Sequence, residues 1–407
     1  MAGPTSRVSR VLMPGPCAPF AEAYAAELSR RGYTPLSTVN QLRQVGRLSR
    51  WLEAQGLSAA DLSGARVEQF LAWQRAGGRH RCQWSRPGLV CLLDVLRALG
   101  VLGAEQPAPA DSPTDLLLRS FERYLLAERG LAAGTVHGYV RHARRFLDGL
   151  SAGGLAGLRP AEVTGAVLAM ASSGVSVSAA QYFVCALRGF LRFCLVEGLL
   201  AADLSPAALA VGGRRSSQLP KGISRADARA LLGACDRRRA LGRRDHALII
   251  LLLRLGLRAG EVARLRLDDI DWRAGELVVR GKGGREDRLP LPADVGEAIA
   301  GYLRRGRPAS SRRELFLRAR APYEPIASAT VRSTVRRVCR RAGIAELGSH
   351  RLRHAAACEM VAAQVPLVWI GQVLRQRSLQ STAIYARVDL DGLRPLARPW
   401  PQAGTQR

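Results

Sequence analysis

The sequence lacks the patterns that mark several common classes of protein. Its eight cysteines, at positions 17, 82, 91, 185, 194, 235, 339 and 358, form no Cys-x-x-Cys pair, which argues against a disulfide framework or a zinc site. The longest apolar run, Ala247–Leu253, is too short to span a bilayer, and the N-terminus has no apolar core of signal-peptide length. No phosphate-binding Gly-rich loop or Gly-x-Ser-x-Gly elbow occurs, so neither ATP use nor serine hydrolase chemistry is indicated. We therefore expect a cytoplasmic protein without cofactor or metal.

Acidic residues are also scarce relative to basic ones. The chain carries 33 Asp and Glu against 61 Lys and Arg, which gives a formal charge of +28. Most of the cations are arginine, whose planar guanidinium binds phosphate through two hydrogen bonds. A GC-rich genome would explain arginine in place of lysine, but it would not explain the excess over acids. The balance predicts a polyanionic partner, with nucleic acid first and an anionic membrane surface second.

Two linkers divide the 407 residues into three parts. Gly103–Pro113 is rich in Pro and Ala, and Val211–Gly222 is rich in Gly, Ser and basic residues, as is typical of connections between domains. We predict an N-terminal helical domain at 1–105, a second helical domain at 106–210, a linker at 211–222, a mixed domain at 223–395 and a tail at 396–407.

The first two parts resemble copies of one another at an offset of 98 residues. Each reads as a unit of four or five helices, with apolar positions at helical spacing and arginines on the opposite face. Ser37 in one copy and Thr135 in the other are the expected helix N-caps. The arginines are interpreted either as a solvated face or as a row that follows a DNA backbone. The overall charge favours the second interpretation, and the candidate DNA contacts are Arg43, Arg47, Arg141 and Arg145.

The third part mixes helices with short strands. Ser224 and Asp227 predict a capping box, and residues 243–255 predict a buried apolar helix. Residues 276–280 and 287–291 predict two strands around the turn at 281–284. Residues 328–341 predict an amphipathic helix with Val331, Val335 and Val338 inside and with Arg332, Arg336, Arg337, Arg340 and Arg341 outside. Arg332 and Arg336 are further candidate DNA contacts.

An acidic cluster precedes the first of these strands. Asp268, Asp269 and Asp271 lie within four residues of one another. Carboxylates bind divalent metals in nucleases, but a short acidic motif is more often a polar turn. We interpret the cluster as a turn and expect no metal there.

What remains is a series of cations that ends in a tyrosine. Arg258 lies in Leu-Gly-Leu-Arg-Ala-Gly-Glu, Lys282 in Gly-Lys-Gly, His350 and Arg353 in His-Arg-Leu-Arg-His, and Tyr385 in Thr-Ala-Ile-Tyr. In this order, and over essentially all of 223–395, the series resembles the catalytic domain of the tyrosine recombinase (phage integrase) family. Residues 106–205 resemble the family's core-binding domain, preceded here by a related extra domain.

The resemblance implies a role for each of these residues. Arg258 and Arg353 would flank a DNA phosphate, where displacement builds negative charge on the nonbridging oxygens. Tyr385 would attack phosphorus and remain attached as a 3′-phosphotyrosine, so that rejoining needs no ATP. His350 would act as the base, and Lys282 would protonate the leaving 5′-oxygen. Glu261 would brace Arg258 or its helix.

One position departs from the family pattern. The family has Leu-Gly-His ending nine residues before the tyrosine, and Gln376 stands here in the place of that histidine. A glutamine amide donates a neutral hydrogen bond, and charge-assisted bonds are about twice as strong. We expect slower cleavage, with Arg375 and Arg377 as candidate compensating charges.

The resemblance also implies a fold and a mode of assembly. We expect a mainly α protein with a small β-sheet in the catalytic domain, shaped as a C-shaped clamp of all-α N-terminal domains and a catalytic domain around DNA. Four protomers would assemble on two specific sites, in the cytoplasm and associated with the nucleoid. The extra N-terminal domain favours an integrase of a mobile element. Two alternatives remain: a catalytically weakened accessory protein, and a type IB topoisomerase.

Overall fold

A computed structural model of the chain describes residues 5–8, 10–77, 86–102, 112–150, 154–213, 222–281 and 285–376. The chain divides into two compact units, Met1–Gly103 together with Gln218–Arg407, and Ala104–Ser217. Three large hydrophobic clusters occupy the described residues, one in each of the N-terminal, middle and C-terminal thirds. The domain boundaries proposed above remain predictions.

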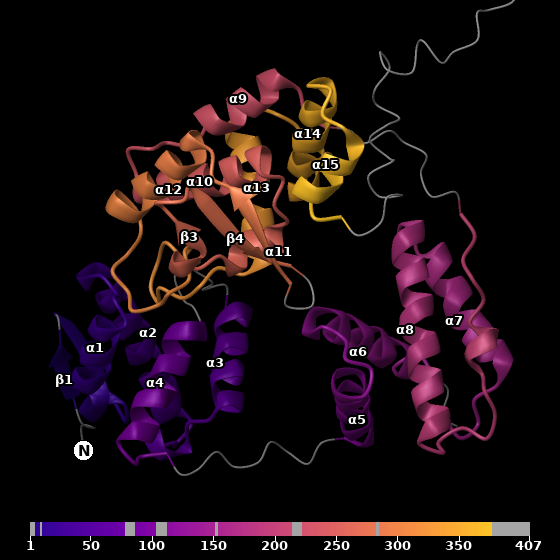
Figure 1. Cartoon of the computed structure of the whole chain (residues 1–407). Helices are drawn as coiled ribbons and strands as arrows, with labels where there is room; N and C mark the ends of the chain where they lie inside the picture. The colour runs from indigo at the N-terminus through magenta and orange to yellow at the C-terminus, as the bar shows by residue number, and fades with distance from the viewer. Residues whose placement is uncertain are drawn as a thin grey trace, which may run out of the picture. The chain divides into compact units, whose positions relative to one another are not determined.

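The described residues of the N-terminal third form a hairpin and four α-helices (Figure 1). Strands β1 (Thr5–Val8) and β2 (Val11–Pro14) pair antiparallel, which corrects the expectation that this part is purely helical. Helices α1 (Ala21–Arg30), α2 (Pro35–Ala54), α3 (Gly64–Ala76) and α4 (Arg86–Ala98) follow. The predicted cap at Ser37 is wrong, because Thr34 caps α2 and accepts from the Ser37 N–H. Pro35 is well suited to the first helical position because it has no N–H to satisfy.

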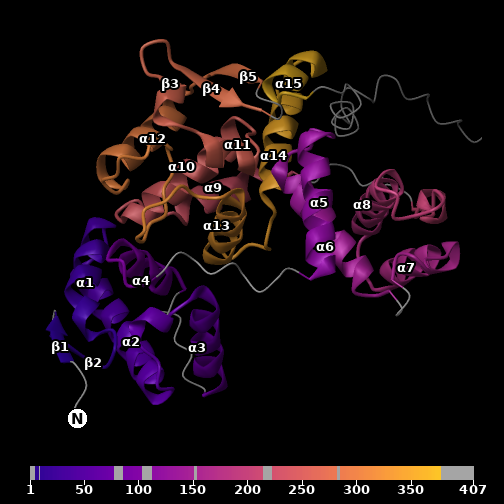
Figure 2. The same cartoon turned by 90° about the horizontal axis from the view of Figure 1, so that it is seen from below.

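The described residues of the middle third form four α-helices in a separate unit (Figure 2). These are α5 (Pro113–Ala127), α6 (Ala133–Leu147), α7 (Pro160–Ser172) and α8 (Val177–Val196). The expected cap at Thr135 is also wrong, because α6 begins after Ala132. Phe121, Phe190 and Phe193 pack with ring centroids 5.2 to 6.4 Å apart and form the aromatic centre of the core.

The two sets of four helices follow the offset seen in the sequence. Helix α6 begins 98 residues after α2, and α8 ends 98 residues after α4. The buried positions of the last helices also correspond at this offset. Leu89, Leu92, Leu93 and Leu96 of α4 are all buried, as are Leu187, Phe190, Leu191 and Cys194 of α8. Both copies therefore bury the same face of their last helix.

Helix α8 is, within the described ranges, the one helix whose length and composition would allow it to cross a membrane, and half of that stretch is buried inside the protein. Phe183, Leu187 and Phe190 lie in the hydrophobic core of its unit. Its Arg188 Nε donates to the Ala208 carbonyl at 2.9 Å. These contacts are those of a core helix.

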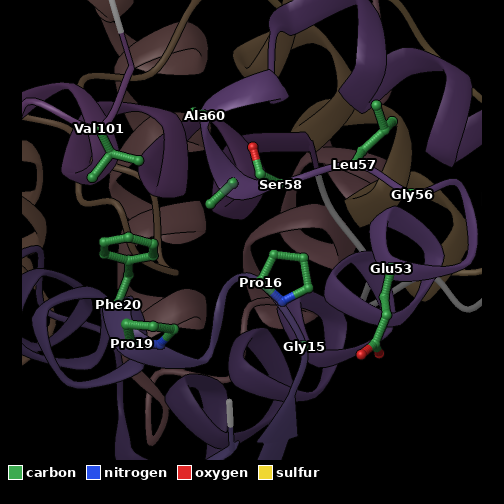
Figure 3. Close-up of a pocket in the computed structure, with 11 residues that line it drawn as sticks. Gly15, Pro16, Pro19, Phe20, Glu53, Gly56, Leu57, Ser58, Ala60 and Val101 are labelled. Atoms are coloured by element: carbon green, nitrogen blue, oxygen red, sulfur yellow. The ribbon is translucent and has the colours of Figure 1, made fainter. Parts of the chain in front are cut away.

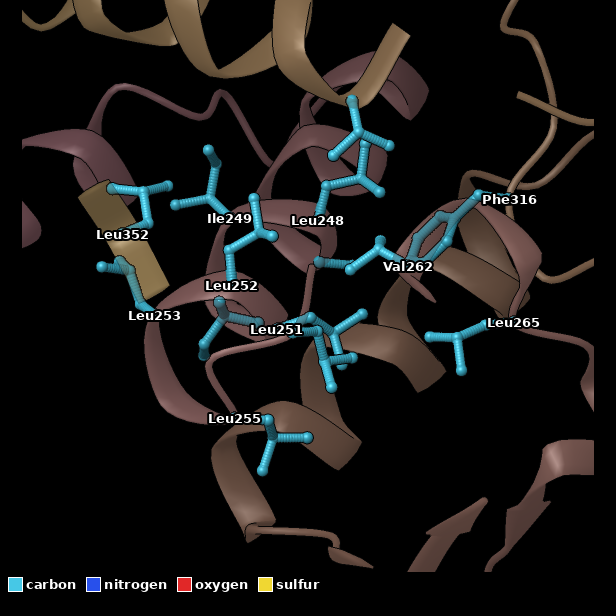
Figure 4. Packing of buried hydrophobic residues seen from close by; sticks show 14 of the residues in the cluster. Leu248, Ile249, Leu251, Leu252, Leu253, Leu255, Val262, Leu265, Phe316 and Leu352 are labelled. Atoms are coloured by element: carbon cyan, nitrogen blue, oxygen red, sulfur yellow. The ribbon is translucent and has the colours of Figure 1, made fainter. Parts of the chain in front are cut away.

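The C-terminal third surrounds the apolar helix α10 (Ala240–Arg254), close to the predicted helix at 243–255. Leu248, Leu251 and Leu252 are fully buried in its core, beside Val262 and other apolar side chains (Figure 4). The surrounding helices are α9 (Arg225–Gly233), α11 (Ala259–Arg264), α12 (Ala293–Arg305), α13 (Ser328–Arg341), α14 (Ser349–Ala362) and α15 (Leu367–Val373).

A three-stranded antiparallel sheet with the order β3-β4-β5 lies in this third of the chain. Strand β4 (Glu276–Arg280) matches the predicted strand at 276–280. Strand β5 (Glu286–Pro290) begins one residue before the predicted strand at 287–291. Strand β3 (Ile270–Asp271) was not predicted. The two longer strands pair with Val278 opposite Arg288.

A pocket in the N-terminal third is lined by none of the predicted site residues (Figure 3). Its lining is mainly apolar and includes Pro16, Phe20, Leu57 and Val101, with Glu53 as its charged residue. A pocket with this lining does not offer cations to a phosphate.

Leu252→Ala is expected to destabilise the C-terminal third by about 2–5 kcal/mol, because the lost methyl groups leave a cavity in a close-packed core. Leu241→Ala, on the same helix but 36% exposed, is the matched control and should change stability far less. Urea denaturation, followed through the hydrogen exchange of the α10 amides, measures the change in stability for both variants. Equal effects of the two substitutions would contradict this account of the core.

Candidate active site

Arg258 stands at the beginning of α11 and is held by Glu261. Its backbone N–H donates to Glu261 Oε2 at 2.8 Å, and its guanidinium Nη1 donates to Oε1 at 2.7 Å. The Glu261 side chain is 3% exposed, whereas that of Arg258 is 45% exposed. The interpretation of Glu261 as a brace for Arg258 is thereby confirmed. The carboxylate fixes one side of a guanidinium whose other side is open to a ligand.

The charge state of Glu261 depends on its arginine neighbours. Burial alone raises the pKa of this carboxyl, because the charged form loses water. Arg375, whose Nη2 donates to Oε2 at 2.9 Å, and Arg258 reverse that effect, so the pKa lies below its ordinary value of 4.5. Glu261 is therefore ionised at neutral pH.

Arg353 lies on α14 and is almost fully buried, at 2% exposure. Its Nη1 donates to the Gly256 carbonyl at 2.6 Å, and its Nη2 donates to the Leu374 carbonyl. Gly256 has φ +56, and a Cβ there would lie 2.6 Å from the Leu374 side chain. Arg353 thus joins the loop before Arg258 to the segment before Gln376.

His350 lies on α14, one turn before His354, and their ring centroids are 5.1 Å apart. Loss of water around the ring lowers the pKa of His350 below 6.5, and the charges of Arg353 and Arg258 lower it further. The imidazole is therefore neutral at pH 7 and able to accept a proton. Loss of water also lowers the pKa of His354, and interactions with His350, Arg353 and Arg351 lower it further.

Gln376 follows α15, and its backbone N–H donates to the Gly371 carbonyl at 2.9 Å. Arg375 immediately before it has φ +53, in the left-handed region, and its side chain is only 4% exposed. Sequence reasoning treated Arg375 as a charge beside Gln376 but missed its ion pair with Glu261. The signal available was an arginine in the glycine position of the family's Leu-Gly-His pattern.

The structure therefore brings four of the predicted site residues into one place: Arg258, His350, Arg353 and Gln376. Lys282 and Tyr385 lie outside the described residues. Gly281 and Arg285, on either side of residues 282–284, are joined by a 2.7 Å hydrogen bond from the Gly281 N–H to the Arg285 carbonyl, and this bond fixes the two ends of the turn.

The candidate DNA contacts are distributed over three helices. Arg43 is exposed and Arg47 partly buried on α2, and Arg141 and Arg145 are exposed on α6. Arg332 and Arg336 are exposed on α13, where Val331, Val335 and Val338 are fully buried as predicted.

The predicted outer face of α13 needs one correction. Arg337 and Arg341 do not face only solvent, because both pair with the buried carboxylate of Asp245 on α10, at 2.9 and 3.6 Å. Asp245 is 0% exposed. The available signal was an aspartate two residues before a long apolar run of the same helix, since a buried acid requires a cation.

Carboxylates of the acidic cluster form ion pairs with arginines. Asp269 pairs with Arg280, and Asp268 pairs with Arg313. Residues Leu267–Asp269 form a single 3-10 turn, as the sequence indicated, although Ile270–Asp271 then forms strand β3. These carboxylates connect the sheet to its neighbours.

The protein is mainly helical, and its site gathers two arginines and a neutral histidine around one point. Such a site defines a class of protein that acts on a phosphodiester, because it suits a phosphate that gains negative charge during reaction. Residues 221–391 match the sequence model of the "Phage integrase family". Residues 118–198 match the model of the "Phage integrase, N-terminal SAM-like domain". A "Putative integrase/recombinase y4rA" of Sinorhizobium fredii is 39% identical over 95% of both chains. The chain belongs to the phage integrase family and is a tyrosine recombinase.

Other relatives and solved structures agree. A "Tyrosine recombinase XerD" of Corynebacterium glutamicum is 30% identical over 70% of this chain and 97% of its own. A lambda integrase dimer bound to a COC′ core site has a TM-score of 0.53 at 18% identity, over 72% of this chain and 99% of that one. A lambda integrase tetramer bound to a Holliday junction has a TM-score of 0.51 at 17% identity, over 72% and 88%. The two structures show that the fold is shared.

Glu261→Gln is expected to destabilise the protein at pH 7 by about 3 kcal/mol or more, because two arginines lose their buried counterion. The folded pKa of Glu261 is lowered, so its contribution is present above pH 4.5 and is lost as the pH falls through the folded pKa. The difference between wild type and variant should therefore shrink in acid.

Glu286→Gln is the control, because Glu286 pairs with Arg280 while 56% exposed and exposed pairs contribute about 1 kcal/mol or less. Thermal unfolding across pH measures both variants. A pH-independent difference for Glu261→Gln would contradict the assigned charge state.

Proposed function

We propose that this recombinase cuts and rejoins DNA at specific sites through a 3′-phosphotyrosine at Tyr385. The observation that supports this most directly is that Arg258, at the start of α11, lies near His350 and Arg353 of α14, in the order in which the family's motifs occur. The family assignment covers the same region.

In this proposal the two arginines receive the charge that builds on the phosphate oxygens. Arg258 offers the exposed side of a guanidinium that Glu261 already orients. Arg353 is held by two backbone carbonyls, so its position needs no rearrangement when DNA binds. Such preorganisation is what makes electrostatic stabilisation effective.

His350 is proposed to receive the proton of the Tyr385 hydroxyl. A free tyrosine has a pKa of about 10, so it must lose its proton as it attacks. The lowered pKa of His350 keeps the imidazole in the form that accepts it. The nearby arginine charges stabilise the phenolate as it forms.

Lys282 is proposed as the acid that protonates the leaving 5′-oxygen. It is one of only two lysines in a chain with 61 basic residues of the Lys and Arg type. A guanidinium does not release its proton near neutral pH, whereas an ammonium group does so readily when its surroundings lower its pKa. A lysine in this arginine-rich chain is thus suited to a step that arginine cannot perform.

Gln376 is proposed to donate a neutral hydrogen bond to the same phosphate. Its backbone is fixed by the bond to Gly371 and by the neighbouring Leu374 carbonyl that Arg353 holds. A neutral donor stabilises the charged transition state less than an imidazolium would. The expected consequence is slower cleavage with intact binding.

DNA binding is proposed to use the arginines of all three thirds. Residues 1–105 would be a duplicated core-binding-like domain, 106–210 the core-binding domain and 223–395 the catalytic domain, closing around duplex DNA as a clamp. Arg43, Arg47, Arg141, Arg145, Arg332 and Arg336 are the proposed phosphate contacts. The lambda integrase tetramer on a Holliday junction supports four protomers on two sites.

The proposed biological role is integration, transposition or excision of a mobile element, supported by the integrase/recombinase names of the relatives. The cytoplasm, with association to the nucleoid, is the proposed location because the substrate is chromosomal DNA. An accessory role without cleavage is not favoured, because Arg258, His350 and Arg353 are all present and placed together.

Covalent trapping on nicked duplexes from the DNA that flanks the gene tests the reaction. Wild type should give an adduct on a denaturing gel, and Tyr385→Phe should abolish it because the attacking oxygen is gone. Gln376→His should strengthen the band, since a positively charged donor attracts the phosphate more strongly than a neutral amide does. Tyr323→Phe is the matched control and should leave the band unchanged.

Absence of an adduct from both wild type and Gln376→His, despite tight binding of the same DNA, would establish the accessory role instead. Relaxation of any supercoiled plasmid, whatever its sequence, would indicate a topoisomerase.

The rate of adduct formation should fall in acid along a limb whose midpoint lies below pH 6.5. The base must be neutral, and the pKa of His350 lies below that ordinary value. His350→Gln should slow cleavage and remove this acid limb, while His137→Gln should preserve it. An acid limb in wild type with its midpoint above pH 6.5 would contradict the assignment of His350 as the base.

A further inference from the structure

Arg375 is a buried arginine in a backbone conformation that disfavours it. Its φ of +53 is one that glycine adopts freely and other residues rarely do. Its side chain is only 4% exposed, although burying a guanidinium removes it from water. Two unfavourable features at one residue beside a reactive site indicate that the residue contributes something there.

The contacts of Arg375 are made with buried or partly buried groups of the protein. Its Nη2 donates to Glu261 Oε2 at 2.9 Å, and its Nη1 donates to the Val373 carbonyl at 2.9 Å. Burial lowers the pKa of this guanidinium, and the Glu261 carboxylate opposes the shift. Arg375 therefore acts through Glu261 and does not itself reach DNA.

The ion pair joins two segments that both carry predicted site residues. Glu261 also holds Arg258 at its backbone and side chain. Arg353 makes a second connection between the same segments, from the Gly256 carbonyl to that of Leu374. Two connections side by side prevent one segment from rotating against the other, which a single connection would allow.

Arg375 also sets the net charge of the cluster. Glu261 and Arg258 alone would sum to zero, so that the brace would cancel the cation it orients. With Arg375 the three groups sum to +1 in a place where solvent screening is weak. The carboxylate can then orient Arg258 without removing the positive field that a phosphate requires.

We propose that Arg375 is a positioning residue. It uses Glu261 to fix the segment that enters Gln376 against the segment that carries Arg258, and it keeps the cluster positive. The inference rests on the proposed function for its effect on cleavage, whereas the connection between the segments is testable without cleavage.

The test compares Arg375→Gly, Arg375→Lys and Gln364→Gly. Gln364 is an exposed residue with φ +58 at the end of α14, so its glycine variant relieves the same backbone strain without touching the cluster. The measurements are the single-turnover rate of adduct formation at saturating DNA, the Kd for that DNA, the Tm, and amide hydrogen exchange at 256–261 and 371–376.

Arg375→Gly should slow adduct formation by about 10- to 100-fold, as small displacements of reacting groups do, with little change in DNA affinity or Tm. Arg375→Lys should recover much of the rate, because it restores the charge opposite Glu261. Gln364→Gly should behave as wild type. Exchange should accelerate at 256–261 as well as 371–376 in Arg375→Gly only.

A wild-type rate for Arg375→Gly would overturn the proposal. So would equal losses of rate and Tm in the glycine and lysine variants, which would indicate a purely structural role. If wild type forms no adduct, the proposed function fails, and hydrogen exchange decides: unchanged exchange at 256–261 in Arg375→Gly would then overturn the connection between the two segments.

Discussion

The burial of the Glu261 carboxylate is the constraint on which the site depends. A buried charge without a partner costs several kcal/mol, so this carboxylate must be surrounded by cations and N–H donors. Arg258 provides its backbone and side chain, and Arg375 provides the second guanidinium. The orientation of the exposed arginine and the path of the segment before Gln376 are consequences of satisfying one acid.

Other acidic residues of the catalytic domain are also paired with arginines. Asp245 in α10 receives Arg337 and Arg341 from α13, and Asp268 and Asp269 receive arginines near the sheet. Asp245 and Asp268 thereby connect segments that lie 92 and 45 positions apart in the chain. Because the scarce acids in these places serve as internal connections, exposed arginines such as Arg332 and Arg336 keep their charge available to a polyanion.

Local pattern was sufficient for much of the fold. The valines of α13, the Ser224 cap of α9 and strand β4 lie where the sequence predicted them, because each depends on residues within a few positions of one another. The caps at Ser37 and Thr135 were wrong, since Thr34 and Ala132 precede earlier helix starts. The N-terminal hairpin and strand β3 were missed because such short strands carry little periodicity.

The sequence by itself determined the class of protein, through its charge and the order of its motifs, because both are properties of the linear chain. Only the tertiary structure decided which arginine pairs with which acidic residue. Arg375 and Glu261 are separated by 114 positions, and Arg337 and Asp245 by 92. In a chain with so many arginines, no spacing rule selects these pairs. They follow from packing, which brings one buried carboxylate within reach of a few guanidinium groups and excludes the water that would otherwise replace them.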